Sequence, residues 1–246
     1  MLDIPHPNIH KRETIMILDD CDKFILDEGV KYLEGYNGPN NTMLELGSHV
    51  GCSSLFFAIE LEFKRILAVE AYWENFKWLV NNIYKNQTED IITPMWAAVS
   101  NKTGNFRPIY WSAEQRNHGQ YGTFFRADFH PQSGFVQTIS FKHLLSLFDS
   151  IDILKVDIEG SEYEIFSPND KKLAKILRKV HFLDLETHCL DEGKYFTDNT
   201  FAQYGYRDTA KANDILANYL DDCGFELDQY GVKIGRMQGY NRKYNG

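Results

Sequence analysis

The chain has 246 residues, and 26 Lys and Arg residues against 35 Asp and Glu residues give it a formal net charge of −9. A hydrophobic content of 43% is enough for a folded core and excludes wholesale disorder. The negative charge argues against a nucleic-acid partner, since such binding needs a basic surface. No stretch approaches the roughly 18 apolar residues of a membrane span, so we expect no membrane insertion.

The N-terminus has no apolar core of a signal peptide, which favours a cytoplasmic location. The cysteines are far apart in the chain and include no CxxC pair, which favours reduced thiols and argues against a zinc site built from them. They are Cys21, Cys52, Cys189 and Cys223.

Residues 11–35 carry apolar side chains at helical spacing, and Gly35 with Gly38 and Pro39 would end that helix. Short apolar strands then alternate with helices, which predicts parallel βαβ units. The expected strands are 42–46, 65–70, 91–99, 151–157 and 180–186. The expected helices are 51–61, 73–84, 141–148, 170–179 and 208–222. Residues 225–229 and 232–240 are expected to form a closing antiparallel hairpin.

These elements predict an α/β, Rossmann-like fold of about seven strands, mostly parallel, with helices on both faces. We expect a single domain over 1–246, with 1–40 as an N-terminal helical extension. Two segments interrupt the alternation. Residues 100–136 are expected to be a hairpin or ordered loop, and 187–209 a second loop, both near the site.

The turn at residues 45–51 joins a predicted strand to a predicted helix. Gly47 allows a tight turn with positive φ, and Gly51 lets the helix begin close to the strand, so a ligand can approach the backbone. Glu70 ends the next strand, where a carboxylate can accept both hydroxyls of a ribose. The pattern therefore favours a ligand that contains adenosine. A plain tight turn is the alternative, because His49 stands where dinucleotide-binding proteins have a second glycine.

The most specific segment is 152–162, with the sequence DILKVDIEGSE. It closely resembles the Lys-x-Asp-x-Glu-Gly-x-Glu hallmark of the FkbM-type methyltransferase family. Residues 45–51, Glu70, 96–100 and 185–188 are similar to further motifs of that family, in the same order. The resemblance covers residues 42–188, with His49 replacing a common Asn and Ala71 a common Pro.

The resemblance implies a class I methyltransferase that uses S-adenosylmethionine and acts on a hydroxyl oxygen of a sugar, glycan or other small molecule. Glu45 is similar to the acid that such sites often carry near the amino acid moiety. The residues expected to bind the cofactor are Glu45, Gly47, Ser48, His49, Gly51, Glu70, Ala71, Ala97 and Asp157.

Asp157, Glu159, Glu186 and His188 are expected around the acceptor. In one mechanism His188 or Asp157 is a general base, and Glu186 orients it. In the other, Asp157, Glu186 and His188 hold a divalent cation such as Mg²⁺, which lowers the pKa of the acceptor hydroxyl.

Plainer interpretations of the same residues stay open. Lys155 can pair with a carboxylate inside the sheet, Glu159 and Glu162 can complement a helix dipole, and His188 can be an ordinary loop residue. The alternative functions are a nicotinamide-dependent oxidoreductase and a non-catalytic binding module. Two roles are considered for the N-terminal extension: it covers the site, or it mediates association into a homodimer.

Overall fold

The computed structural model describes residues 2–5, 15–18, 36–112, 121–122, 129–188, 204–206, 211–228, 231–232 and 235–245. For 2–5, 15–18, 110–112, 121–122 and 129–133 it describes the main chain alone.

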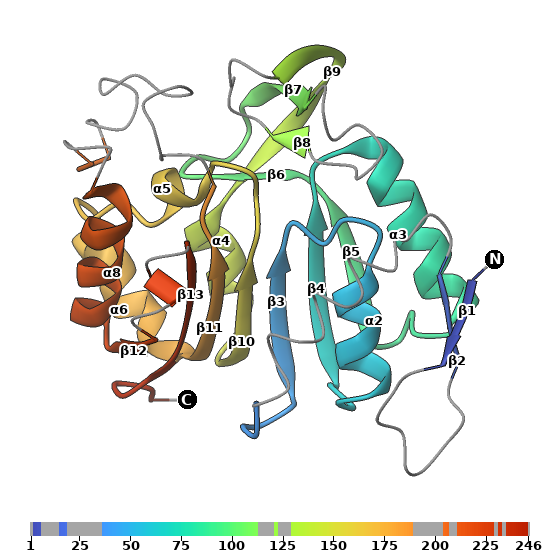
Figure 1. Ribbon diagram of the computed structural model, residues 1–246, viewed down its shortest axis with the longest axis horizontal. Coiled ribbons are helices and arrows are strands. Elements are labelled where there is room, and N and C mark those ends of the chain that lie inside the picture. The colour runs from blue at the N-terminus through green and yellow to red at the C-terminus, as the bar shows by residue number, and fades with distance from the viewer. Residues whose placement is uncertain are drawn as a thin grey trace.

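A central seven-stranded sheet has the strand order β12-β13-β11-β10-β3-β4-β5 (Figure 1). Within it, β13 runs antiparallel to both of its neighbours, and the other pairings are parallel. This confirms the predicted fold. The strands are β3 (Thr42–Leu46), β4 (Arg65–Glu70), β5 (Ile92–Trp96), β10 (Ile151–Val156), β11 (Val180–Glu186), β12 (Phe225–Leu227) and β13 (Arg236–Asn241).

Helices cover both faces of this sheet because its strands alternate their side chains between two cores. Met43 packs with α2 and α3, whereas Leu44 and Leu46 pack with α4, α6 and α8. Figure 1 shows these two groups of helices on opposite sides of the strands. The helical elements are α2 (Cys52–Ile59), α3 (Trp73–Lys85), α4 (Phe141–Ser146), α5 (Glu162–Ile165), α6 (Lys171–Ile176), the 3₁₀ turn η2 (Leu177–Lys179) and α8 (Ala212–Cys223).

A second, four-stranded sheet has the order β6-β9-β7-β8 and stands at the carboxyl ends of β3 and β4 (Figure 1). Its strands are β6 (Ala98–Ser100), β7 (Phe106–Ser112), β8 (Tyr121–Gly122) and β9 (Phe129–Ser140). The antiparallel pairing of β7 with β8 and β9 agrees with a hairpin, one of the two structures expected in 100–136. The single strand expected over 91–99 is instead divided, since β5 ends at Trp96 and β6 pairs with β9 in the smaller sheet.

The N-terminal residues differ from the prediction. Strand β1 (Leu2–Pro5) pairs antiparallel with β2 (Ile15–Leu18), so the helix expected over 11–35 is wrong at 15–18. A short apolar run such as Ile-Met-Ile-Leu satisfies either period, and here the strand pairing decides. The other residues of that predicted helix lie outside the described part of the chain.

The cysteines follow the prediction only in part. Cys223 is free, as expected, and is buried, whereas Cys52 is disulfide-bonded. Cys21 and Cys189 lie outside the described residues.

Among the described helices, none has the length and apolar character needed to cross a bilayer.

The turn after β3 is packed directly against the turn after β10. Gly47 has a φ of +83°, and a Cβ built on it would lie 1.6 Å from the carbonyl oxygen of Asp157. The Asp157 N–H also donates to the Leu46 carbonyl at 2.9 Å. Only glycine satisfies both the backbone conformation and this contact, so Gly47 fixes how closely the two loops approach.

We predict that Gly47→Ala lowers the free energy of unfolding by at least about 3 kcal/mol, because it combines a left-handed φ with a steric clash. Gly104→Ala is the matched control, since Gly104 has a φ of +86° and no atom within 4 Å of a built Cβ. This control should cost about 1 kcal/mol. Denaturant unfolding measures both values, and equal losses would contradict the role given to the contact.

Candidate active site

The glycine-containing loop turns sharply to begin α2 beside the end of β4. The N–H groups of Gly47 and Ser48 both donate to the Val69 carbonyl, at 2.8 and 3.0 Å. Gly51 has a φ of +93°, and a built Cβ would lie 2.7 Å from Leu79 Cδ1 on α3. His49 also has a positive φ, of 50°. The backbone is thus held close to the sheet, as the two glycines predict.

Glu70 ties this loop to the end of β4. One carboxylate oxygen accepts the His49 N–H at 2.9 Å, and the other accepts the Tyr72 N–H at 2.7 Å. Burial raises the pKa of Glu70 to about 7, although the backbone hydrogen bonds partly oppose the shift. Each oxygen can accept a further hydrogen bond, so the carboxylate keeps capacity for a ligand.

The smaller residues expected at the cofactor lie around Glu70. The Ala97 N–H donates to the Glu70 carbonyl at 3.0 Å, and the Ala71 carbonyl accepts the Trp96 indole N–H at 2.9 Å. Ser48 is buried, and its hydroxyl donates to the Val69 carbonyl at 3.3 Å. These contacts gather the expected residues at the carboxyl ends of β3, β4 and β5.

Glu45 lies deeper than the sequence suggests. It is fully buried and accepts hydrogen bonds from the hydroxyls of Ser53 and Ser54 at the start of α2. Lys155 lies opposite it on β10, with 3.4 Å between Lys155 Nζ and a Glu45 oxygen. Glu45 therefore anchors α2 to the sheet, and its expected contact with a cofactor stays a prediction. The ion pair expected for Lys155 inside the sheet is confirmed.

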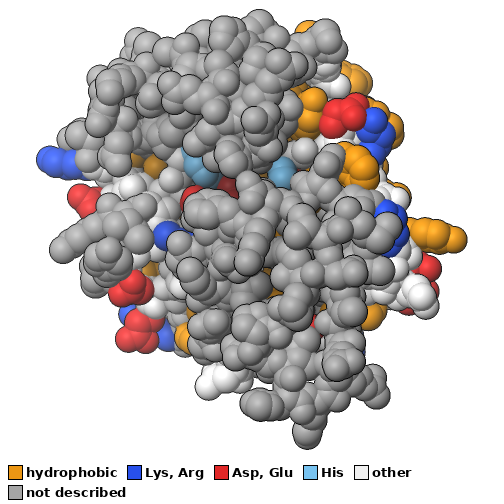
Figure 2. Space-filling view, turned by 45° about the vertical axis from the view of Figure 1, so that its right-hand side comes forward, with side chains coloured by type: hydrophobic (Ala, Val, Ile, Leu, Met, Phe, Trp, Pro, Cys, Tyr) orange, Lys and Arg blue, Asp and Glu red, His pale blue; other side chains and the backbone are white. Residues whose placement is uncertain are grey.

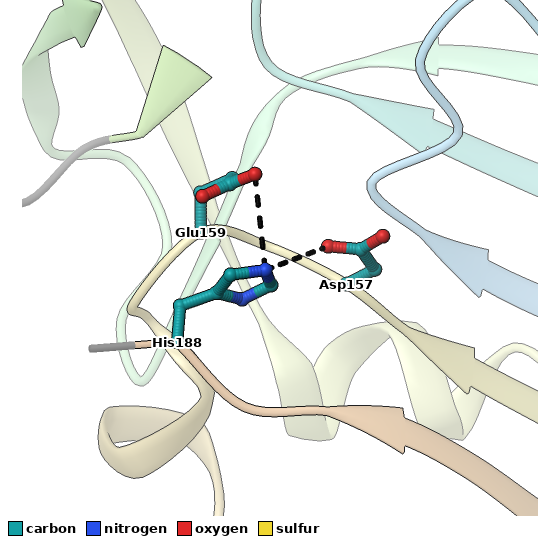
Figure 3. Close-up of side chains that lie close together, drawn as sticks. All are labelled: Asp157, Glu159 and His188. Carbon is teal, nitrogen blue, oxygen red and sulfur yellow. Dashed lines mark ion pairs between the residues drawn. The ribbon is translucent and has the colours of Figure 1, made fainter. Parts of the chain in front are cut away.

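His188 lies at the centre of a group of carboxylates at the ends of β10 and β11 (Figure 3). Its Nε2 atom is 3.6 Å from Asp157 Oδ1, 3.8 Å from Glu159 Oε1 and 3.6 Å from Glu186 Oε1. The structure thus brings together the four residues expected at the acceptor. On the face drawn in Figure 2, histidine side chains lie at the surface, with acidic side chains nearby.

Glu162 holds this group in place, although its sequence position indicated only a helix-dipole role. One of its oxygens accepts the Ile158 N–H at 3.0 Å and lies 3.1 Å from His188 Nδ1, and the other accepts the Gly160 N–H at 2.8 Å. The loop it closes includes Glu159 with a φ of 53°. The sequence could have predicted a site role for Glu162, because this residue is the last acid of the hallmark segment.

Because the Glu162 carboxylate accepts hydrogen bonds, His188 Nδ1 carries the proton that points to it. His188 Nε2 therefore faces the other carboxylates. Burial alone would lower the pKa of His188, but Glu159, Glu162 and Asp157 together raise it well above its usual value.

Arg236 is a second residue of the site that the sequence did not predict. Its Nη1 is 2.9 Å from Glu186 Oε2, and its Nη2 is 3.5 Å from Asp184 Oδ2. Burial and the nearby Asp157 raise the pKa of Glu186, and His188 and Arg236 oppose the shift. Arg236 comes from β13, opposite Glu186 in the antiparallel register.

Three of the described residues have ligand atoms within reach of one metal ion. They are not the three residues expected from the sequence. Atoms of Asp157, Glu159 and His188 all lie within 4.8 Å of one another. This group contains Glu159, whereas the sequence predicted Glu186 as its third member.

We predict that Glu70 makes stability depend on pH. Its pKa rises from 4.5 to about 7 on folding, so the folded protein keeps a proton that the unfolded chain releases in this range. The free energy of unfolding should fall by about 3 kcal/mol as the pH rises through this window. Denaturant unfolding at several pH values measures the slope. Glu70→Gln should flatten it, and an unchanged slope in this variant would contradict the assignment.

One family model matches the part of the chain that contains most of this site. The model of the methyltransferase FkbM domain matches residues 45–227, which include the glycine loop, Glu70 and the His188 cluster. No curated protein matches the chain significantly.

Among solved structures, the chain is similar to methyltransferase FkbM from Methylobacillus flagellatus, at 14% identity and a TM-score of 0.46. The match covers 82% of this chain and 43% of that protein, so the chain spans less than half of its length. A Staphylococcus aureus protein provisionally described as a caffeoyl-CoA O-methyltransferase matches at 15% identity and a TM-score of 0.47, over 90% of this chain and 84% of its own.

The family match covers well over half of the chain and includes every residue of the site described above except Arg236. The chain therefore belongs to the FkbM methyltransferase domain family.

Proposed function

We propose that the protein transfers a methyl group from S-adenosylmethionine to a hydroxyl oxygen of a sugar, glycan or other small molecule. The observation that carries the proposal is the contact between the two loops. Gly47, in the expected cofactor loop, packs against the carbonyl of Asp157, which belongs to the carboxylate group around His188. A cofactor on the first loop would therefore lie beside groups that can take a proton.

The residues of the glycine loop fit an adenosine-containing cofactor. The Glu70 carboxylate faces the loop, and both of its oxygens can still accept a ribose hydroxyl. Ala71 and Ala97, which have small side chains, adjoin Glu70 at the strand ends. S-adenosylmethionine supplies a sulfonium-bound methyl group, which is transferred by in-line displacement.

The protein must position the acceptor and accept its proton. The acceptor oxygen forms the bond to the methyl carbon, the sulfur–carbon bond breaks, and its electron pair stays on sulfur. The hydroxyl proton goes to a carboxylate of the cluster, Asp157 or Glu186. We favour a carboxylate because, without a bound cation, the raised pKa of His188 favours the protonated form of that ring. The alternative in which a divalent cation activates the hydroxyl is compatible with the same geometry.

Partners and location remain proposals. The net charge of −9 supports a small-molecule or glycan acceptor over a nucleic acid. A homodimer stays a prediction, as does the cytoplasmic location. The disulfide at Cys52 weighs against the cytoplasm, because disulfides are rare in that reducing compartment.

We predict that S-adenosylhomocysteine binds the purified protein and that NAD⁺ does not. Titration calorimetry should show the difference directly. Glu70→Gln should weaken S-adenosylhomocysteine binding at least about tenfold, since it removes the charge that strengthens the ribose hydrogen bonds. Glu74→Gln is the control, because Glu74 is exposed and pairs with Lys77 on α3. Binding of NAD⁺ alone would support an oxidoreductase instead.

We further predict that Asp157→Asn lowers kcat by at least about tenfold, as expected for loss of a group that handles the proton. Affinity for S-adenosylhomocysteine should change less than kcat does. Turnover is followed as S-adenosylhomocysteine release with the best acceptor from a panel of sugars and glycans. Cofactor binding without turnover on any acceptor would instead favour a non-catalytic module. Thermal unfolding checks that the variant is folded.

A further inference from the structure

We propose that Asp157, Glu159 and His188 form a divalent-cation site suited to Mn²⁺, and that Glu162 is the positioning residue that orients His188. The proposal deepens the proposed function and rests on it for the nearby acceptor. It differs from the set expected from the sequence by replacing Glu186 with Glu159.

The distances within this group fit ligands of one ion. His188 Nε2 lies 3.6 Å from Asp157 Oδ1 and 3.8 Å from Glu159 Oε1. Both separations are too long for hydrogen bonds. Two ligands that are each about 2.1 Å from a common ion stand roughly 3 to 3.5 Å apart, so a small contraction would complete the site. Figure 3 shows the carboxylates of Asp157 and Glu159 reaching toward the same ring nitrogen.

Glu162 gives His188 the arrangement typical of a metal ligand. Metal-binding histidines commonly donate their other ring N–H to a carboxylate, which fixes the tautomer and directs the remaining nitrogen to the ion. Glu162 lies 3.1 Å from His188 Nδ1 and is itself held by the N–H groups of Ile158 and Gly160. Glu162 is completely buried, so its orientation is fixed by the loop.

The donor set indicates the class of ion. Carboxylate oxygens suit Mg²⁺, Ca²⁺ and Mn²⁺, whereas imidazole nitrogen suits transition metals, so for one imidazole with two carboxylates we choose Mn²⁺, the transition metal among these oxygen-preferring ions. A dication would also offset the mutual repulsion of the carboxylates that surround His188.

Glu186 has a different position in this arrangement. Its Oε2 is engaged by Arg236 at 2.9 Å, and it does not belong to the group that comes within reach of one ion. With Asp157 coordinated, Glu186 would be the carboxylate of the cluster that takes the acceptor's proton.

The test is Mn²⁺ binding by the full chain, followed by the loss of the free-ion signal in electron paramagnetic resonance, with no acceptor present. We expect the wild type to bind Mn²⁺ and Asp157→Asn and Glu159→Gln to bind at least about tenfold more weakly. Glu162→Gln should also weaken binding about tenfold while leaving the three ligands in place. Glu226→Gln, an exposed acid on β12, should stay within about twofold of the wild type.

Absence of Mn²⁺ binding by the folded wild type would overturn the proposal, as would Asp157→Asn and Glu159→Gln variants that bind like the wild type. Thermal unfolding establishes that each variant is folded. S-adenosylhomocysteine titrations in EDTA separate this outcome from failure of the proposed function. Cofactor binding without Mn²⁺ binding would contradict only the proposed cation site. Absence of cofactor binding by the wild type would contradict the proposed function.

Discussion

The contact between Gly47 and the Asp157 carbonyl is the constraint on which the site depends. Strands β3 and β10 are parallel neighbours, so their loops leave the same edge of the sheet side by side. A side chain at residue 47 would separate the loops, because its Cβ would overlap the carbonyl oxygen. Glycine therefore sets the distance between the backbone expected to hold the cofactor and the carboxylates expected to handle the acceptor. This close packing fixes residues 45–51 and the hallmark segment 152–162 next to each other.

Two buried carboxylates organise these loops by accepting backbone N–H groups. Glu70 holds residues 49 and 72, and Glu162 holds residues 158 and 160 together with the His188 ring. Burial of Glu70 raises its pKa substantially. A ligand that offers hydroxyl donors to Glu70 would favour the ionised form. The same group can thus shape the loop and recognise a ribose.

The sequence predicted the sheet and the group of His188 with three carboxylates, because parallel strands bring residues at their carboxyl ends to one edge. It did not predict Arg236 as a partner of Glu186, since antiparallel pairing with the last strand depends on register that spacing does not reveal. Glu159 reaches the cluster through a left-handed φ, which residue type does not predict. Glu162 could have been identified from its motif, but a helix-dipole role explained its position equally well. The apolar run Ile15–Leu18 fitted either period, and its pairing with β1 decided the outcome.

A crystal structure of the protein with S-adenosylhomocysteine would test the central claim most directly. The account predicts that the ribose hydroxyls donate to Glu70 and that the sulfur lies between the Gly47 loop and the carboxylates around His188. The open side of the sulfur, where the methyl group of the substrate form sits, should face Asp157 and Glu186. A nucleoside bound away from Glu70, or a sulfur directed away from His188, would contradict the idea that the two loops form one methyl-transfer site.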